Sequence, residues 1–288
     1  MKKFHLIIDV ANCEDCNNCF LACKDEFMDN EWPGYSASQP RHGQRWMNIF
    51  RSERGSYPLV EVGFLPQPCM HCDAAPCVGA GGGAVVKRED GIVIIDPDKA
   101  RGNKKLVDSC PYKAIWWNED KQFAQKCTGC AHLLDSGWKE PRCVQVCPTQ
   151  ALRYAYVEDS EFSKMIAAEE LEAYHPEYGT KPSVYYKNLH RYTKCFIGGS
   201  IAERKNGVED CVSGAKITIF SGSTKIGEAV SDTYGEFKVD RLESNSGPYR
   251  VEISANRSAR SIEVESLPKS LNLGVILVSQ AMEAGSTR

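Results

Sequence analysis

The sequence of 288 residues predicts an α+β protein, and two observations carry this prediction. Cysteine is unusually frequent, with 14 in all, and twelve of them lie between Cys13 and Cys147. From about Gly198 the cysteine pairs give way to short segments that alternate apolar and polar residues, which is typical of an antiparallel β-sandwich. We therefore expect three regions: a cysteine-rich domain at 1–157, a helix and extended connector at 158–197, and a small antiparallel β-sandwich at 198–288.

Composition and charge limit the class of protein. Hydrophobic residues at 42% and charged residues at 25% are typical of a globular chain, and a net charge of −3 argues against a nucleic-acid partner. The apolar run at 4–8 is too short for a signal peptide and is followed by Asp9, so we expect the first β-strand there. No apolar stretch approaches the roughly 18 residues of a membrane span. We expect a cytoplasmic protein without a membrane span.

The first cysteine run, from Cys13 through Cys16 and Cys19 to Cys23, has the spacing C-x2-C-x2-C-x3-C. Bacterial ferredoxins use this run to hold [4Fe–4S] clusters, and its fourth cysteine binds a different cluster from the first three. One such run therefore predicts a partner run elsewhere in the chain.

The remaining cysteines supply partners for this run. They form a C-x2-C-x4-C group, an isolated Cys-Pro, a C-x2-C pair, and a last pair that also ends in Cys-Pro. Under the crossing rule we divide the twelve cysteines into three complete sets, each for one [4Fe–4S] cluster: Cys13, Cys16, Cys19 with Cys147; Cys127, Cys130, Cys143 with Cys23; and Cys69, Cys72, Cys77 with Cys110. The predicted fold of this region is a double ferredoxin-like domain, and no catalytic side chain is predicted.

Four positions where further ligands would complete the symmetry lack cysteine. A full run ending at Cys110 would place cysteines where the chain has Ala100, Asn103 and Leu106, and the second group would end near Gly81. These four positions are the ligands of one cluster under the same rule. We infer an ancestor with four clusters that lost one.

Other interpretations of the cysteines are weaker. Structural zinc sites combine two C-x2-C pairs and do not use the longer run, and disulfide frameworks belong to small secreted domains. Cys195 and Cys211 lie outside the runs, and we expect two buried free thiols. We expect His71 and His132 to be solvated or to donate a hydrogen bond near a cluster. Three lysines beside the cysteines, Lys24, Lys113 and Lys126, could raise a reduction potential, although surface lysines are common.

Smaller elements are predicted along the chain. Val85 to Ile95 has the pattern of a hairpin that turns at Asp90-Gly91. Ser160 begins an amphipathic helix that runs to Ala173, and 184–189 is an extended piece lying back across the cluster domain. The later strands are expected at 215–220, 235–239, 249–254 and 271–277. The segment 231–237 resembles the turn and strand of transthyretin-like sandwiches, and we expect a docking or structural module there.

Four cysteine groups with crossed ligation resemble the iron–sulfur electron-transfer subunits of the DMSO-reductase family of molybdenum or tungsten enzymes. Within this family the chain is similar to the small subunits of the trihydroxybenzene transhydroxylases, with which it shares the missing fourth cluster. The stretches that carry this similarity include 13–23, 30–35, 45–48, 68–72, 88–93, 125–128, 131–135, 179–182 and 185–189.

The resemblance implies an electron relay and a large partner subunit that carries molybdenum on bis-molybdopterin guanine dinucleotide, where the chemistry takes place. The segment from Cys143 to Pro148 is closer to the generic ferredoxin ending, which leaves room for a related phenolic hydroxylase of the resorcinol type. A subunit of a respiratory reductase and a free-standing ferredoxin-like carrier are two further hypotheses for this sequence.

Overall fold

The computed structural model describes residues 1–205, 207–255 and 258–278. The chain forms two compact units, the first made of Met1–Arg51 and Phe64–Leu189, the second of Ser52–Gly63 and His190–Arg288. The last ten residues of the expected sandwich, 279–288, lie outside the described residues. Within the described ranges, no helix has both the length and the apolar character needed to cross a bilayer.

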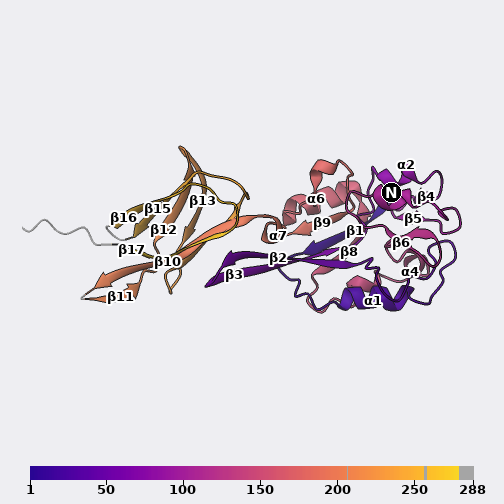
Figure 1. Ribbon diagram of the computed structural model, residues 1–288, viewed down its shortest axis with the longest axis horizontal. Coiled ribbons are helices and arrows are strands. Elements are labelled where there is room, and N and C mark those ends of the chain that lie inside the picture. Colours follow the sequence, from indigo (N-terminus) through magenta and orange to yellow (C-terminus); the bar gives the residue numbers. More distant parts are fainter. Residues whose placement is uncertain (206, 256–257, 279–288) are drawn as a thin grey trace, which may run out of the picture. The chain divides into compact units, whose positions relative to one another are not determined.

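The first unit is built on a three-stranded sheet with the order β8-β1-β9 (Figure 1). Strand β1 (Lys2–Asp9) lies in the middle, antiparallel to β8 (Leu152–Glu158) and parallel to β9 (Val184–Lys187). Its apolar run is almost fully buried, because a central strand is covered on both faces. The predicted first strand is confirmed, and so is the extended piece that returns across this unit.

Short helices and hairpins surround this sheet. The helices are α1 (Asn18–Phe27), α2 (Pro76–Ala80), α3 (Lys105–Asp108), α4 (Ala131–Asp135) and α5 (Arg142–Gln145). The hairpins pair β4 (Val85–Lys87) with β5 (Val93–Ile95), and β6 (Trp116–Asn118) with β7 (Phe123–Gln125). The predicted hairpin at 85–95 is confirmed, and its turn is closed by a bond from Arg88 N to the Ile92 carbonyl at 2.8 Å.

Helix α6 (Asp159–Glu169) differs from its predicted bounds. Ser160 lies inside the helix and makes no cap, and two acidic residues, Asp159 and Glu161, occupy the first turn, where the helix dipole favours them. The helix ends at Glu169, four residues earlier than expected. The backbone N–H of Glu172 donates to the Tyr186 carbonyl at 2.8 Å. Glu172 therefore forms an isolated β-bridge with Tyr186 of β9 and does not continue the helix. A one-turn 3₁₀ helix, η1 (Pro176–Tyr178), lies in the connector beyond it.

The second unit contains two four-stranded sheets, which follow a one-turn helix, α7 (His190–Thr193). One sheet holds β10 (Cys195–Lys205), β11 (Val208–Cys211), β14 (Glu236–Leu242) and β17 (Leu271–Leu277). The other has the order β13 (Thr224–Val230), β12 (Lys216–Ser221), β15 (Tyr249–Ala255) and β16 (Ser258–Val264). The four strands predicted here are present, and β10, β11, β13 and β16 are additional.

The inner faces of the two sheets share one hydrophobic core. Ile197 and Val239 from one sheet pack in the same cluster as Ile217 and Val251 from the other. The pairing is not wholly antiparallel as expected, because β17 lies parallel to β10. The chain has crossed from the other sheet at that point, and a parallel neighbour needs such a crossover.

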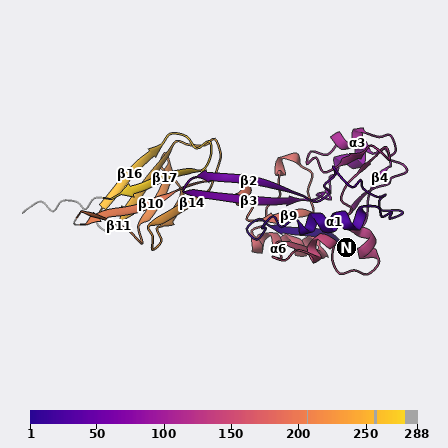
Figure 2. The ribbon, with the colours of Figure 1, turned by 60° about the horizontal axis from the view of Figure 1, so that its bottom comes forward.

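A long hairpin of β2 (Asn48–Ser56) and β3 (Leu59–Gln67) was not predicted (Figure 2). Its tip belongs to the second unit, where the Arg54 guanidinium forms ion pairs with Glu61 at 2.6 Å and with Asp240 on β14 at 2.7 Å. The Arg54 side chain is buried, so the pairs satisfy a charge that would otherwise be costly to bury. Sequence pattern alone misses the hairpin because its exposed face carries apolar residues such as Val60.

Candidate metal centres

All 14 cysteines are free thiols, and the twelve that the sequence groups as ligands lie in the first unit. Asp15 and Asn17 have positive φ angles of 55° and 62°, a left-handed conformation that Asp and Asn tolerate well. These two residues therefore bend the loop that contains Cys16. The pKa of Cys13 is raised to about 11, chiefly by burial and in part by the nearby charges of Cys147, Asp15 and Cys16. Cys13, Cys16 and Cys147 thus lie near one another.

Cys19 completes this first group. Burial raises its pKa to about 12, and it lies within electrostatic reach of the other three members. Cys16 is exposed, while Cys13 and Cys147 are half-buried, so this group lies closest to solvent.

A second group gathers Cys23, Cys127, Cys130 and Cys143. Burial raises the pKa of Cys23 and of Cys143 well above the ordinary value, and the Cys127 and Cys130 thiols add to both rises. Cys130 immediately precedes α4 and has a left-handed φ of 53°. Gly129 donates its N–H to Cys127 Sγ at 3.3 Å. A backbone donor to sulfur stabilises the thiolate form that a metal requires.

The third group lines a small cavity, whose walls include all four of its thiols and apolar residues. Its members are Cys69, Cys72, Cys77 and Cys110. Burial raises the pKa of Cys72 to about 12 and that of Cys77 to about 11. A hydrogen bond from Thr180 partly offsets the rise at Cys72. The role of Thr180 was missed, because nothing in the local sequence around it marks a contact with a cysteine over a hundred residues away.

The three groups follow one another in space. Cys19 of the first group acts on the pKa of Cys143 in the second, and Cys69 of the third acts on that of Cys127 in the second. The group that contains Cys23 therefore lies between the other two. The third group borders the apolar cluster that includes Cys77, Ala100 and Leu106.

The four positions that lack cysteine meet in this apolar cluster or beside it. Ala100 and Leu106 are fully buried, and Asn103 Nδ2 reaches the Ala80 carbonyl at 3.4 Å. A Cβ on Gly81 would lie 2.6 Å from a methyl group of Val85. The place where symmetry predicts a fourth cluster is filled by packed side chains.

Two histidines near the cysteines are buried, so the first of the two expectations, that they are solvated, is wrong for both. His71 has no exposed surface, and its backbone N–H donates to Cys69 Sγ at 3.5 Å. Its ring lies 3.9 Å from Cys127 Sγ through Nε2. His132 Nε2 is 2.9 Å from a carboxylate oxygen of Glu26. Burial holds the pKa of His71 well below its ordinary value.

Lys126 is also buried and differs in this from a typical surface lysine. Its Nζ donates to the carbonyls of Val93 and of Cys127, the latter at 3.0 Å. It lines the cavity of the third group of thiols. Lys113, beside Cys110, is exposed.

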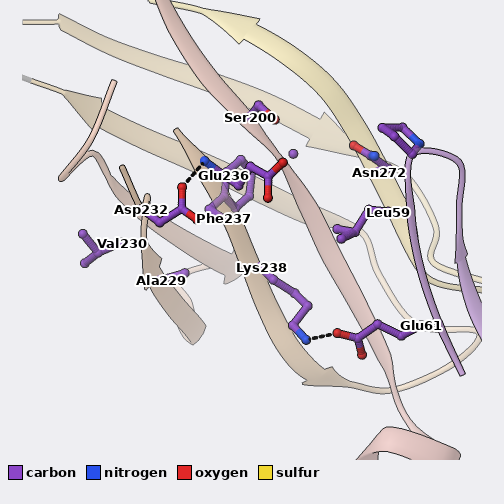
Figure 3. Close-up of a pocket in the computed structure, with 12 residues that line it drawn as sticks. Leu59, Glu61, Ser200, Ala229, Val230, Asp232, Glu236, Phe237, Lys238 and Asn272 are labelled. Atoms are coloured by element: carbon purple, nitrogen blue, oxygen red, sulfur yellow. Dashed lines mark hydrogen bonds and ion pairs between the residues drawn. The ribbon is translucent and has the colours of Figure 1, made fainter. Parts of the chain in front are cut away.

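The two cysteines outside the three groups differ in exposure to solvent. Cys195 is buried in the core of the second unit, as expected, whereas Cys211 is exposed at the end of β11, so that half of the expectation is wrong. A pocket in the same unit is lined mostly by uncharged residues, and charged side chains in its wall make local contacts (Figure 3). Lys238 pairs with Glu61 there, and Asp232 accepts the N–H of Glu236 at 2.9 Å.

The thiol groups fit iron–sulfur chemistry. Four thiols with backbone donors to sulfur and an apolar surround are the donor set of a [4Fe–4S] cluster, which takes four cysteines. In the described ranges, no three His, Cys, Asp or Glu side chains are placed to hold a single metal ion.

Comparison with known proteins gives the class and then the family. Residues 60–157 match the model of a 4Fe-4S dicluster domain, so this is an iron–sulfur protein with a ferredoxin-like domain. The chain is 48% identical over 279 residues to the pyrogallol hydroxytransferase small subunit of Pelobacter acidigallici, covering 96% of this chain and 99% of that one. The chain belongs to the family of pyrogallol hydroxytransferase small subunits. The family expected from the sequence is thereby confirmed.

Two further relatives are subunits of other oxidoreductases. A sulfite dehydrogenase subunit of Allochromatium vinosum is 34% identical, over 65% of this chain and 83% of its own length. An iron–sulfur subunit assigned to a dimethyl sulfoxide reductase in Halobacterium salinarum is 32% identical, over 65% of this chain and 80% of its own. These alignments leave about a third of the chain unmatched, unlike the alignment with the hydroxytransferase subunit.

Proposed function

We propose that this chain is the iron–sulfur relay subunit of a molybdopterin enzyme of the pyrogallol–phloroglucinol transhydroxylase type, which acts on trihydroxybenzenes. The observation that carries the proposal is the 48% identity with the hydroxytransferase small subunit over 96% of the chain. A respiratory oxidoreductase of the wider family is less favoured, because the relatives of that kind named above match 65% of the chain.

Three [4Fe–4S] clusters are proposed, and when bound they would supply one-electron transfer along a row. The ligands we propose are the three groups of thiols that lie together: Cys13, Cys16, Cys19, Cys147; Cys23, Cys127, Cys130, Cys143; and Cys69, Cys72, Cys77, Cys110. Their proximity within each group and the order of the groups support this assignment.

The side chains and backbone of this chain would do three things at these sites. Burial removes water from the thiols, and it makes a free thiolate costly unless a metal balances its charge. Backbone N–H groups of His71 and Gly129 donate to sulfur, and a third comes from Ala114 to Cys110 Sγ at 3.5 Å. These donors orient the ligands and favour the reduced state.

A large catalytic subunit is the proposed partner, in a heterodimer or a higher assembly, with molybdenum on bis-molybdopterin guanine dinucleotide. The hydroxyl transfer would occur on that subunit. We place the complex in the cytoplasm, because free thiols are kept reduced in that compartment.

The second unit is proposed to be a sandwich of the immunoglobulin or transthyretin-like kind that serves as a docking or structural module. Two sheets over one core support this proposal. The domain bounds we propose remain 1–157, 158–197 and 198–288, and limited proteolysis of the complex would test them through its preferred cleavage sites.

The test is the metal content of the native complex, purified without oxygen through a tag on this chain. We expect about twelve irons per chain from three clusters, with molybdenum on a co-purifying large subunit. The purified complex should convert pyrogallol to phloroglucinol. Reduction of a quinone with no transfer between trihydroxybenzenes would favour the respiratory reductase. About twelve irons without molybdenum or a partner would favour a free carrier.

A further inference from the structure

One histidine touches the sulfur atoms of two different thiol groups. The backbone N–H of His71 donates to Cys69 Sγ at 3.5 Å, and its ring Nε2 lies 3.9 Å from Cys127 Sγ. Cys69 belongs to the third group and Cys127 to the second. His71 is fully buried and packs edge-on against Phe4, so its ring has little freedom to leave this position.

The hydrogen bonds of the ring determine which nitrogen carries the proton. The backbone N–H of Val93 donates to Nδ1 at 3.0 Å, so Nδ1 accepts and holds no proton. A neutral imidazole then carries its proton on Nε2, which is the nitrogen that faces Cys127 Sγ. His71 therefore presents one N–H to each sulfur, the first from its backbone and the second from its ring.

A buried cation lies beside this histidine. Val93 connects the two residues, because its N–H bonds His71 Nδ1 and its carbonyl accepts from Lys126 Nζ. The Lys126 ammonium lines the cavity of the third group and also bonds the carbonyl of Cys127 in the second. Its charge acts on Cys77 and Cys110 on one side and on Cys127 on the other.

We propose that His71 and Lys126 are positioning residues for electron transfer, which together raise the reduction potentials of two neighbouring clusters. The inference rests on the proposed function, since it takes the second and third thiol groups as cluster ligands. Reduction adds negative charge to a cluster, and an N–H donor to sulfur or a nearby cation stabilises that charge. The Lys126 charge acts on both clusters, so its removal lowers both potentials. The ring of His71 acts on the second group alone, because the contact with Cys69 is made by the backbone N–H, which a side-chain substitution keeps.

The experiment is a redox titration of the intact complex, followed by electron paramagnetic resonance, on His71→Leu and Lys126→Met. In Thr180→Val the hydrogen bond to Cys72 is lost, so this variant shifts one signal and identifies the third group. We expect Lys126→Met to lower that signal and one other. His71→Leu should lower only the other signal, because the backbone N–H that donates to Cys69 Sγ remains. The expected shift is about tenfold in the reduction equilibrium, or about 59 mV for one electron. The signal of the group that contains Cys13 should not move.

Controls separate charge from packing. Lys113→Met removes an exposed lysine three residues after Cys110, where solvent screens the charge, and should shift every signal by less than twofold. Lys126→Arg keeps the charge and should restore the potentials. If the Leu and Met variants lose iron, His71→Gln and Lys126→Gln keep polar donors in place, and Lys126→Gln alone should still lower both potentials.

The outcomes distinguish the two proposals. If Lys126→Met retains about twelve irons but shifts one signal or none, or if His71→Leu shifts no signal, the proposed role is overturned and the relay function stays intact. A wild-type complex without [4Fe–4S] signals overturns the relay function itself. Two signals lowered together in Lys126→Met, one of these two lowered in His71→Leu, and the third fixed in both variants support the inference.

Discussion

Two regions of the first unit correspond under the inferred symmetry of the cysteine runs, but they differ in what can fill the space between their loops. The first group of thiols, with Cys13 and Cys147, is open enough to solvent that Cys16 is exposed. The symmetry-related positions hold Ala100 and Leu106, which are fully buried in an apolar cluster. Where thiols are present, a metal cluster can fill the space between the loops. Where they are absent, aliphatic side chains fill it.

We infer from this difference that a cluster in this fold would serve as part of the core as well as a redox centre. Loss of four ligands alone would leave a cavity, and cavities in cores are costly. Under the inferred loss, leucine occupies one of the four positions and glycine another, Gly81, where a side chain would clash with Val85. The stability of the filled region should therefore depend on apolar packing, and that of the loops around the thiol groups on bound metal.

The largest expected effect follows from Cys147→Ala. We expect about four of twelve irons to be lost, because Cys147 is proposed to complete the set of Cys13. Iron per chain in the anaerobically purified complex measures this. Adding Cys13→Ala should cost no further iron, whereas adding Cys127→Ala should remove about four more.

The matched control is Cys195→Ala, since Cys195 is a buried cysteine in the other unit and should leave about twelve irons. If Cys127→Ala added nothing to Cys147→Ala, the crossed sets would be wrongly assigned.

The next effect tests the filled region. Leu106→Ala should destabilise the complex by about 2–5 kcal/mol, because Leu106 is fully buried and the loss leaves a cavity. The midpoint of thermal unfolding should fall while the iron content stays constant. Val86→Ala, on the exposed face of the neighbouring hairpin, should change stability by about 0.5 kcal/mol or less. Equal effects at the two positions would contradict the packing role.

The thiol groups could be proposed from the sequence because cluster ligands occur at fixed spacings that the chain shows directly. The same spacing rule marks Ala100 and Leu106 as positions without a ligand, and both are buried in an apolar cluster. The assignment of the twelve ligands itself stays a prediction. Strands such as β12 (Lys216–Ser221) were found because their alternation matches one buried face.

Other features depend on tertiary contacts that no local pattern encodes. The burial of Lys126 and of His71 follows from β5, whose residue Val93 bonds both side chains. The hairpin of β2 and β3 was missed because its tip is held by Arg54, whose partner Asp240 is 186 residues away. Helix α6 ends early because Glu172 pairs with Tyr186, which sequence periodicity cannot show.

A smaller effect sharpens the account of the filled region. In Gly81→Ala the new Cβ would lie 2.6 Å from a methyl group of Val85, and the overpacking should cost about 1–3 kcal/mol. Gly79→Ala, in helix α2 where a Cβ meets nothing within 4 Å, should be neutral or stabilising. Thermal unfolding of the complex measures both. The effects of Gly81→Ala and Val85→Ala should be less than additive, and full additivity would rule out the clash.

The smallest effect concerns His5. Its polar ring is buried, in contrast to the apolar side chains of Ala100 and Leu106 in the filled region. His5 stacks on Phe162 with ring centroids 3.7 Å apart, and neither ring nitrogen has a hydrogen-bond partner among the residues that the structure describes. Burial lowers the pKa of His5 to about 4 from an ordinary value of 6.5, and the charges of Asp159 and Asp73 only partly oppose this, while Lys3 and Lys87 reinforce it. The folded state therefore holds the neutral ring.

Because the unfolded chain takes up a proton below pH 6.5 and the folded chain resists it down to about pH 4, stability is lost as the pH falls through this range. The loss should be on the order of 1 kcal/mol at pH 5.5. His5→Phe keeps the stacked ring and removes the proton site, so its unfolding midpoint should fall less than that of wild type between pH 7 and pH 5. Leu106→Ala lowers the midpoint equally at both pH values, because an apolar cavity binds no proton. Parallel pH profiles for wild type and His5→Phe would show that His5 does not contribute to the acid sensitivity of this unit.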